Sequence, residues 1–422
     1  MSPAPLQTPD RLDIVVQRKL ENVSSGNCAY LETFLTAAKD AGLDVRVIFA
    51  PWRSFENRPW ASIHPRLEKL MDQVVWQSSI KLGHRYWSTS PRIWGRFGIR
   101  IVKEVMRRLG ANIQIPTYFS TPLNTGERDR VAAILKQDLA DITVAEYSSL
   151  GPVLADLPQD KTVHAVLMHD VLSDRGPALR AGNIIPNFVE MSAEEELSWM
   201  STSKLNFYAS RNEMKSFGSR LPDAHNVWLR PNVPHFSEPP VTGPPRLVFV
   251  GTLHAGNVDS VVHFYDEIWP KVRQALPEVE LLIAGSTGPA LPKHIQTADG
   301  IKVLGRVGEL ADLGGPQSIT IAPTRTATGI SIKVAEYLLL RTACVAYPVA
   351  IAGFGDALEG LLEVHETPDD FADAVIRLYK NDKLRHDLAN KAGDHAPNCL
   401  SNSEVVAALR NAVERPQAKL TE

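Results

Sequence analysis

The stretch SITIAPTRTATGISIKVAEYLLLRTACVA, residues 318–346, places a polar loop and a helical pattern between two apolar runs. The first run, 318–323, is rich in β-branched residues and ends at a proline-containing loop, which is typical of a buried strand. Ile332, Ala335 and Leu339 then fall on one face of a helix. A strand, a helix and a second strand in this order predict a parallel sheet covered by helices.

The same alternation of short apolar runs and helical segments extends over most of the chain. Continuous apolar runs of this length are typical of strands that are buried on both faces of a parallel sheet. We therefore expect an α/β fold throughout. The predicted strands lie at 12–16, 44–50, 141–147, 163–169, 205–210, 226–230, 246–251, 279–285, 301–305, 318–323 and 344–350.

The chain of 422 residues is too long for one ordinary hydrophobic core and predicts two or three domains. Six prolines occur among the sixteen residues 231–246, and proline continues neither a helix nor a central strand. We interpret this segment as a linker between an N-terminal domain at 1–235 and a C-terminal domain at 246–395. Residues 396–422 then form a tail with one amphipathic helix at 401–414. Two such domains predict a ligand cleft between the carboxyl ends of their sheets.

The composition argues against several classes of protein. The formal net charge of −3, from 45 basic and 48 acidic side chains, provides no overall field that would attract nucleic acid. Cys28, Cys344 and Cys399 are widely separated and odd in number, which favours a reducing compartment over a disulfide framework or a metal site. The first residues lack the pattern of a signal peptide, and no apolar run approaches the roughly 20 residues of a membrane span. We therefore expect a cytoplasmic protein.

The polar loop of the opening stretch has the composition of an anion site. Gly329 allows a backbone conformation that other residues avoid, and the helix that follows offers free N–H groups to a phosphate. Lys333 and Arg325 could bind the same phosphate, and Glu336 could accept hydrogen bonds from two ribose hydroxyls. Alternatively, Lys333 and Glu336 form an ordinary solvated pair that stabilises the helix only slightly.

Three segments in order resemble one protein family. They are RLVFVGTLHAGNVDSVVHFYDEIWPKVRQALPEVELLIAGS at 246–286, GIKVLGRVGEL at 300–310, and the opening stretch. Over roughly residues 246–355 they are similar to the donor domain of family-4 glycosyltransferases, which have the GT-B fold. The resemblance implies two Rossmann-like domains that face each other across a cleft. It also implies retaining transfer of a sugar from a nucleotide-sugar to a hydroxyl acceptor in glycan or polysaccharide assembly, without a cofactor or a metal.

The resemblance assigns roles to residues of the donor domain. It implies that Glu336 binds the ribose and that Lys333 and Arg325 are catalytic cations on the diphosphate. Two positions depart from the family pattern, because Thr328 replaces a carboxylate that many members carry and the turn at 251–257 lacks the usual arginine and lysine. The further donor-binding residues that we expect are Gly329, Ile330, Ser331, Thr328, Gly251 and His254.

The N-terminal half offers fewer candidates. Gly26 and Asn27 follow the first predicted strand, where the resemblance implies a loop at the cleft and the acceptor, although an ordinary turn explains them equally well. His169 ends an apolar run and is similar to a family histidine beside the donor sugar, so it joins the catalytic candidates. The alternative for His169 is a buried structural histidine. Ser210 and Glu213 have the spacing of a helix-capping box.

The most unusual local composition is at 81–108, KLGHRYWSTSPRIWGRFGIRIVKEVMRR. Eight basic residues occur there with the single acidic residue Glu104, and aromatic residues are interleaved among them. Such a segment suits an anionic membrane surface, since aromatic rings lie at the headgroup level and cations meet the phosphates. A solvated helix is the alternative, and nucleic acid has no other support in the sequence. We therefore expect peripheral membrane contact, which would suit a lipid-linked acceptor.

Two other functions remain open at this point. A nucleotide-sugar 2-epimerase also uses a two-domain cleft, but it would need carboxylates and histidines for proton abstraction. The second alternative is a non-catalytic protein that binds a sugar nucleotide, because Thr328 replaces a carboxylate. The similarity to a donor domain favours transfer over both.

Overall fold

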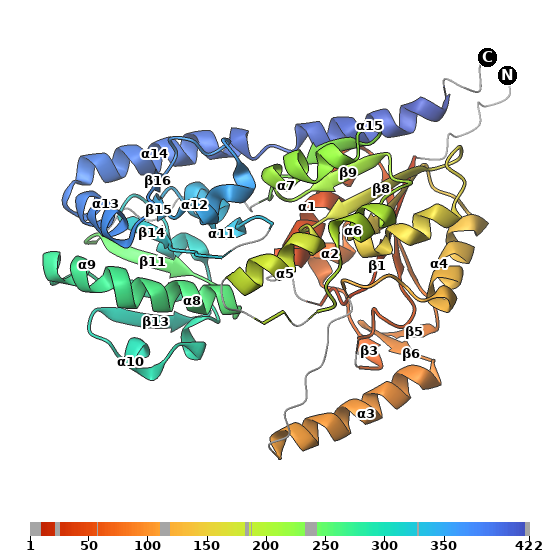
Figure 1. Ribbon diagram of the computed structural model, residues 1–422, viewed down its shortest axis with the longest axis horizontal. Coiled ribbons are helices and arrows are strands. Elements are labelled where there is room, and N and C mark those ends of the chain that lie inside the picture. The colour runs from red at the N-terminus through yellow and green to blue at the C-terminus, as the bar shows by residue number, and fades with distance from the viewer. Residues whose placement is uncertain are drawn as a thin grey trace.

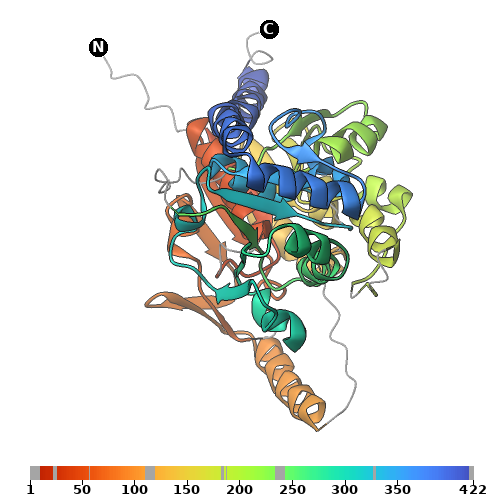
Figure 2. The ribbon, with the colours of Figure 1, turned by 90° about the vertical axis from the view of Figure 1, so that its left-hand side faces the viewer.

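The structure is a computed structural model in which two parallel sheets form two lobes that lie side by side (Figure 1). Helices pack around each sheet, and the last two helices run along one side of both lobes (Figure 1). A long helix and a small sheet project from the body of the N-terminal lobe (Figure 2). The residues that the structure describes are 10–21, 26–56, 58–109, 119–181, 185–186, 188–232, 243–326 and 329–417.

The N-terminal lobe is built on a seven-stranded sheet in which all neighbouring strands are parallel. The strand order is β10-β9-β8-β7-β1-β2-β4, so that the order reverses at β1, with β2 on one side and β7 on the other. The strands are β1 Arg11–Val16, β2 Asp44–Phe49, β4 Gln73–Trp76, β7 Ile142–Glu146, β8 Val163–Met168, β9 Leu205–Tyr208 and β10 His225–Trp228.

The C-terminal lobe repeats this design with a six-stranded parallel sheet. Its strand order is β13-β12-β11-β14-β15-β16, and the order reverses at β11, which lies between β12 and β14. The strands are β11 Arg246–Val250, β12 Leu281–Ala284, β13 Ile301–Gly305, β14 Ser318–Ala322, β15 Ala343–Ala346 and β16 Glu363–Val364.

The helices alternate with these strands along most of the chain. In the N-terminal lobe they are α1 Gly26–Asp40, α2 Pro65–Glu68, α3 Pro91–Arg108, α4 Thr125–Gln137, α5 Leu172–Ala181, α6 Ala193–Trp199 and α7 Arg211–Ser216. The helices that follow are α8 Ala255–His263, α9 Trp269–Ala275, α10 Lys293–Gln296, α11 Ile332–Leu339, α12 Pro348–Ile351, α13 Pro368–Lys380, α14 Asp382–Cys399 and α15 Ser403–Gln417.

Each apolar run that was predicted as a strand is a strand, which confirms the α/β fold with parallel sheets. The strands that the sequence did not indicate are β4, β16 and a small antiparallel sheet of order β3-β6-β5. Two of its strands, β5 and β6, lie at the start of the basic segment 81–108, for which the sequence suggested only a helix. Its strands are β3 Trp60–Ala61, β5 Ser79–Leu82 and β6 Arg85–Ser88.

The C-terminal helix α15 returns to the N-terminal lobe. Val405 and Leu409 of α15 are fully buried in the same apolar core as Leu12 of β1. The side chain of Asn402 holds the start of this helix, since it accepts from the backbone N–H of Arg230 and donates to its carbonyl oxygen, both at 2.9 Å. Most of the predicted linker, residues 233–242, lies outside the described residues, so the domain boundaries stay a prediction.

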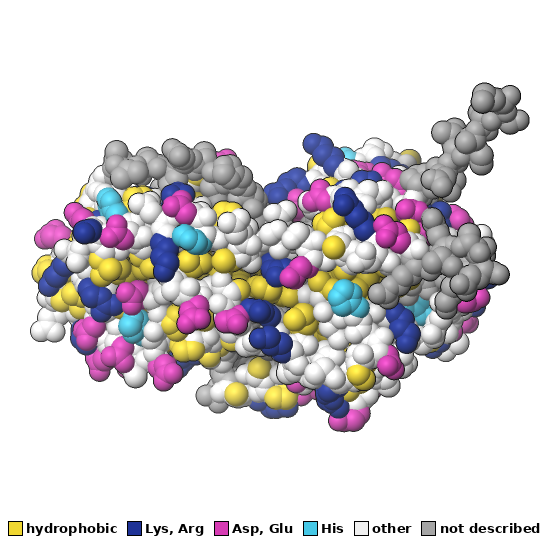
Figure 3. All heavy atoms as spheres, turned by 90° about the horizontal axis from the view of Figure 1, so that it is seen from above, with side chains coloured by type: hydrophobic (Ala, Val, Ile, Leu, Met, Phe, Trp, Pro, Cys, Tyr) yellow, Lys and Arg dark blue, Asp and Glu magenta, His cyan; other side chains and the backbone are white. Residues whose placement is uncertain are grey.

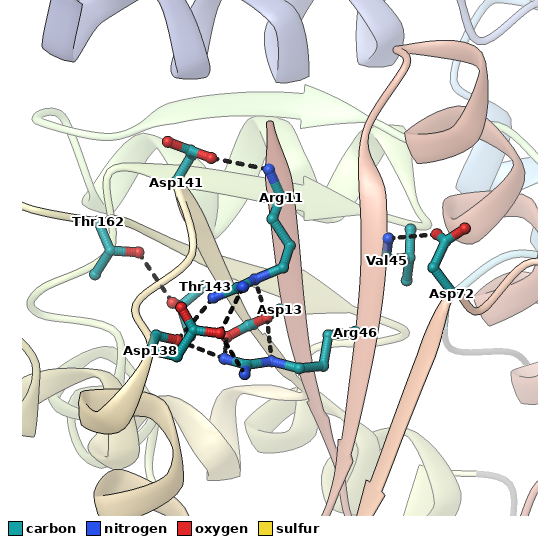
Figure 4. Close-up of polar contacts among 9 residues, drawn as sticks. All are labelled: Arg11, Asp13, Val45, Arg46, Asp72, Asp138, Asp141, Thr143 and Thr162. Atoms are coloured by element: carbon teal, nitrogen blue, oxygen red, sulfur yellow. Dashed lines mark hydrogen bonds and ion pairs between the residues drawn. The ribbon is translucent and has the colours of Figure 1, made fainter. Parts of the chain in front are cut away.

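A cluster of ion pairs lies at the end of the N-terminal sheet where β1 begins (Figure 4). Asp13 is fully buried and accepts hydrogen bonds from Arg46 at 2.8 and 2.5 Å. Arg46 and Arg11 both contact Asp138, at 3.2 and 2.6 Å. Removing one partner of a buried pair costs about 3–5 kcal/mol. The cluster therefore stabilises the edge opposite to the one where parallel sheets bind ligands.

The surface carries a mixture of charges. Over the face shown in Figure 3, Lys and Arg side chains are interspersed with Asp and Glu on both lobes, as the small net charge implies. Within the described part of the chain, no helix is long and apolar enough to cross a membrane.

Candidate functional site

Polar residues gather at the carboxyl ends of the two sheets, where each strand order reverses. Arg18 and Glu146 come from the ends of the neighbouring strands β1 and β7. His254 and Arg325 follow the neighbouring strands β11 and β14. Open α/β sheets bind ligands at such reversals. Contacts between the lobes bring the two edges together.

Gly329 is the residue at which the two edges meet. Its φ of +68° lies in the region that favours glycine, as the sequence predicted. A Cβ atom at this position would lie 2.9 Å from the backbone oxygen of His169, so a side chain has no room. The Gly329 N–H donates to Oε1 of Glu213 at 3.0 Å. In this state the N–H is therefore engaged by a carboxyl group of the N-terminal lobe rather than free for a phosphate.

Glu213 links helix α7 to this loop. Ser210 accepts from the Glu213 backbone N–H at 3.2 Å, as the predicted capping box requires. The Glu213 carboxyl group instead faces the backbone N–H groups of Gly329 and Val171. Burial raises the pKa of Glu213 to about 8, the charge of Asp170 adds to the rise, and the two N–H groups oppose it. This contact between the lobes therefore depends on pH near neutrality.

Replacing Glu213 by glutamine should flatten the dependence of stability on pH between about 4.5 and 8. The pKa of Glu213 is about 8 in the folded protein and has an ordinary value of 4.5. Between these values the unfolded state binds fewer protons, so the free energy of unfolding of the wild type falls as pH rises. Urea unfolding at several pH values measures this slope. Glu195→Gln, at an exposed site on α6, is the matched control, and equal slopes in wild type and Glu213→Gln would refute the assignment.

Lys333 lies in the first turn of α11 and is partly buried. Its Nζ donates to Oδ1 of Asn257 at 2.5 Å and lies 4.7 Å from the centroid of the Phe249 ring. Asn257 is held in turn, because its amide donates to the backbone oxygen of Thr252 at 2.9 Å. Burial lowers the pKa of Lys333 to about 8, and the charge of Glu336 opposes this shift. An ammonium that has lost most of its water would gain strongly from an anionic ligand.

Glu336 lies one turn after Lys333 and is also partly buried. Burial raises the pKa of Glu336, and the charge of Lys333 lowers it. Lys333 and Glu336 do not form an ion pair within the described residues. The Lys333 ammonium instead donates a hydrogen bond to Asn257. This arrangement disfavours the alternative of an ordinary solvated pair. The ribose-binding role of Glu336 stays a prediction.

His254 caps helix α8. Its Nδ1 accepts from the backbone N–H of Gly256 at 3.2 Å. Burial lowers the pKa of His254, and the positive charges of Arg175 and Lys333 lower it further. The ring is therefore neutral at neutral pH. The amino end of α8, with its partial positive charge, consequently lies in the field of one cation from each lobe.

Arg175 is the cation from the N-terminal lobe, on helix α5, which extends toward α8 in Figure 1. It donates to Oδ2 of Asp170 at 2.7 Å, and its guanidinium lies 5.1 and 5.6 Å from the ring centroids of Phe119 and Phe188. The Cβ atom of Asp170 lies 3.5 Å from the point that a Cβ atom on Gly329 would occupy. Arg175 is thus held beside the contact between the lobes.

Arg325 is exposed and is not a free cation. Its guanidinium forms a two-point contact with Asp259 of α8, with Nε 3.1 Å from Oδ2 and Nη2 close to Oδ1. A diphosphate would have to share Arg325 with this carboxylate. The role of Arg325 in phosphate binding stays a prediction.

Gly251 lies where two turns pack backbone against backbone. A Cβ atom on Gly251 would lie 2.7 Å from Oγ1 of Thr287. A Cβ atom on Gly285 would lie 2.2 Å from the Gly251 carbonyl oxygen. These contacts fix the turn between β11 and α8, and hence the positions of His254 and Asn257. Direct contact of Gly251 with a donor stays a prediction.

His169 lies at the carboxyl end of β8 and is almost fully buried. Its Nε2 is 3.1 Å from Oε1 of Glu146, its ring stacks on Tyr147 at 4.4 Å, and Tyr30 meets it edge-on at 5.3 Å. Burial lowers the pKa of His169, and Glu146 opposes the shift. Nδ1 of this neutral ring has no hydrogen-bond partner among the described residues. Both a sugar contact and a structural role agree with this geometry.

Glu146 fixes the ring of His169 and is itself fully buried. It accepts hydrogen bonds from Nε and Nη2 of Arg18 at 3.0 and 2.6 Å. Burial alone would raise the pKa of Glu146, but Arg18 and His169 hold it at about 2. The ionised carboxylate only accepts, so Nε2 of His169 carries the proton. Arg18 also donates to the backbone oxygen of Asn27 at 2.7 Å and to Sγ of Cys28 at 3.0 Å, which ties the start of α1 to His169.

The remaining predicted residues surround these contacts. Gly26 is the first residue of α1, and the side chain of Asn27 is exposed. Ile330 is partly buried and packs against the apolar cores of both lobes, whereas Ser331 precedes α11 without a side-chain capping bond. Thr328 lies outside the described residues.

The sequence did not indicate Arg18, Glu146, Asn257 or Arg175 as site residues. One signal was present, because the acidic Glu146 ends an otherwise apolar strand, where an unpaired charge would be costly. The described residues contain no group of three His, Cys, Asp or Glu side chains that could hold a metal ion. That the reaction needs no metal or cofactor stays a prediction.

Comparisons with known proteins agree with this architecture. Residues 244–381 match the family model described as Glycosyl transferases group 1. Among solved structures, the chain is similar to S. aureus TarM, with a TM-score of 0.65 and 11% identity over 96% of this chain and 99% of that one. It is similar to sucrose-phosphate synthase from Thermosynechococcus elongatus, with a TM-score of 0.61 and 12% identity over 98% and 100%.

A third similar structure is Anabaena Alr3699/HepE in complex with UDP and glucose, with a TM-score of 0.57 and 10% identity over 97% of this chain and 100% of that one. Curated protein sequences provide no significant match. At these identities the likeness concerns the fold, and it confirms the predicted GT-B architecture of two Rossmann-like lobes.

Proposed function

We propose that the protein transfers a sugar from a nucleotide-sugar to a hydroxyl acceptor, because residues 244–381 match the family model Glycosyl transferases group 1 and the chain has the GT-B fold. The observation that supports this most is the position of the Lys333 ammonium at the amino end of α8, where Nζ lies 2.5 Å from Oδ1 of Asn257 and His254 caps the helix. A diphosphate carries the negative charge that such a site lacks.

The chemical step develops negative charge on the leaving diphosphate. Lys333, Arg175 and the amino end of α8 would stabilise that charge, which is the electrostatic assistance that such a leaving group needs. Lys333 suits this task, because it is held by Asn257 with Nζ 2.5 Å from Oδ1 and its amine has little water to lose. Residues on both lobes take part, so donor binding would favour the arrangement in which the lobes touch.

We propose that the anomeric configuration is retained. The bond from the anomeric carbon to the phosphate oxygen breaks, and the acceptor oxygen attaches on the same face of the sugar. The proton of the acceptor hydroxyl passes to an oxygen of the leaving phosphate, so we assign no protein base. His169 is held by Glu146, with Nε2 3.1 Å from Oε1, and would contact the donor sugar rather than carry this proton.

The donor is proposed to be a nucleoside-diphosphate sugar whose ribose hydroxyls donate to Glu336. A UDP-sugar is the first to test, because the structures of TarM and HepE that resemble this chain were obtained with UDP. For the acceptor we propose a lipid-linked hydroxyl compound in glycan or polysaccharide assembly. This assignment rests on the membrane contact that is argued from α3 below.

A turnover assay with a panel of nucleotide-sugars tests the proposal. We expect one donor to release its nucleoside diphosphate in the presence of an acceptor extract, with the sugar recovered in a glycosidic product. Conversion of the sugar without an acceptor would instead indicate a 2-epimerase. Binding of a nucleotide-sugar without turnover on any acceptor would favour the non-catalytic alternative, and loss of turnover in Lys333→Ala is the control for the site.

A further inference from the structure

Helix α3 stands out from the N-terminal lobe as an exposed two-faced helix. It follows the small antiparallel sheet and projects from the body of the molecule (Figures 1 and 2). Large apolar side chains on α3 and just after it are between 46% and 82% exposed, the lowest being Trp94 and the highest Leu109. An isolated exposed apolar residue is ordinary, whereas a row of them marks an interaction surface.

The apolar residues lie on one side of the helix. Successive residues of a helix are rotated by about 100°, which places all of the exposed apolar residues of α3 within one arc of about 160°. The lobe covers little of the side of the helix that this arc occupies, since each residue on it is at least 46% exposed. The residues of this apolar arc are Trp94, Ile99, Ile101, Val102, Val105, Met106 and Leu109.

The basic residues lie beside the apolar arc and not within it. By the same rotation of about 100° per residue, Arg92, Arg96, Arg100 and Lys103 fall within an arc of about 80° next to Ile99. Helix α3 contains six Lys or Arg residues and one acidic residue, Glu104. An apolar arc bordered by a basic arc is the pattern of a helix that lies in a membrane interface.

The third side of α3 fixes the helix to the lobe. Ile93 is almost fully buried, and the ring of Phe97 meets Trp60 edge-on at a centroid distance of 5.2 Å. Trp94 is anchored at the edge of the apolar arc, because its Nε1 donates to the backbone oxygen of Ser88 at 2.9 Å. The two functional arcs of α3 thus have a defined orientation relative to the N-terminal lobe.

We propose that α3 docks the protein on an anionic lipid surface, with the apolar arc inserted at the headgroup boundary and the basic arc on the lipid phosphates. The apolar arc and the basic arc together favour an anionic lipid surface as the partner of α3, because a purely apolar partner would leave the basic arc without counter-charge. The inference extends the sequence prediction for 81–108, since it adds insertion of a defined apolar arc to electrostatic attraction. It does not depend on the proposed transferase activity.

Vesicle flotation with the full chain tests this proposal. The protein should float with vesicles of phosphatidylcholine and phosphatidylglycerol and stay behind with phosphatidylcholine alone. Reversing three charges of the basic arc, in Arg96→Glu/Arg100→Glu/Lys103→Glu, should weaken partition by about tenfold or more. Replacing three residues of the apolar arc, in Ile99→Ser/Val102→Ser/Met106→Ser, should weaken it by a similar factor.

A matched control and a second measurement make the outcome decisive. Lys380→Glu/Lys383→Glu/Lys391→Glu makes the same change of charge at exposed sites of α13 and α14 and should float like the wild type. Failure of the wild type to bind anionic vesicles, or equal binding by the α3 variants, would overturn the proposal. Sedimentation that shows a dimer which dissociates in the apolar-arc variant, without flotation of the wild type, would instead identify a contact between two copies and would equally overturn it.

Discussion

Replacing Lys333 by alanine should lower kcat/KM for sugar transfer by about 10³-fold, in the range expected when a group that stabilises transition-state charge is removed. Lys333 is a partly buried cation of the site, and its ordered partner is a neutral amide, Asn257. Its charge would therefore act on the leaving diphosphate with little screening. The fall should appear mainly in kcat, because the charge on the diphosphate grows as the reaction proceeds.

The protonation of Lys333 provides a second signature of the same role. Since its pKa is lowered to about 8 in the free protein, the charged form that binds phosphate is lost as pH rises through that value. The affinity of the wild type for a nucleoside diphosphate should therefore fall above about pH 8. The affinity of the Lys333→Ala variant should not change over the same pH range. Lys302→Ala is the control, because Lys302 is an exposed lysine of the same lobe that pairs with Glu280. Unchanged kcat/KM in Lys333→Ala would remove this residue from the mechanism.

Replacing Glu146 by alanine should lower the free energy of unfolding by about 3–5 kcal/mol, because it leaves the largely but not fully buried guanidinium of Arg18 without its counter-charge. The pKa of Glu146 is about 2 against an ordinary value of 4.5. The stability that Glu146 contributes is therefore present above about pH 4.5 and is lost as pH falls toward 2. Chemical denaturation at neutral and acidic pH measures both effects.

Glu146→Gln separates the structural role from the positioning of His169. The amide can still accept from Arg18, but it carries no charge, so the variant should fold with a smaller loss of stability. Its kcat should fall by about 10²-fold, since the ring of His169 is no longer held in one tautomer and orientation. Glu68→Ala, which breaks an exposed pair with Lys81, should cost less than about 1 kcal/mol. If the Glu146→Ala variant were as stable as Glu68→Ala, the stabilising role of the Glu146–Arg18 pair would be contradicted.

The local structure of the proposed donor side could be predicted from the sequence because its determinants are local. The strand β14, the conformation of Gly329 and the helix with Lys333 and Glu336 all belong to one short stretch of chain. Each part also has a strong signal of its own, such as the apolar strand and the glycine before a helix. What the stretch did not reveal is the partner of each group, because Asn257, Asp259 and Glu213 come from other elements.

The N-terminal side of the site could not be predicted, because it depends on the order of strands in the sheet. Arg18 and Glu146 are 128 residues apart and meet only because β1 and β7 are neighbours at the reversal. A sequence pattern shows that both strands exist but not that they are adjacent. The return of α15 to the N-terminal lobe is similarly hidden, since its apolar face would suit either core.

Calorimetric titration of the wild type and of Lys333→Ala with UDP, GDP and ADP, beside the corresponding nucleosides, tests the central claim most directly. We expect one diphosphate to bind the wild type saturably and at least about tenfold more weakly to the variant, while the nucleoside is affected little. If none of the diphosphates binds the folded wild type, or if the variant binds as tightly, the site described at Gly329, His254 and Lys333 is not a nucleotide-sugar site.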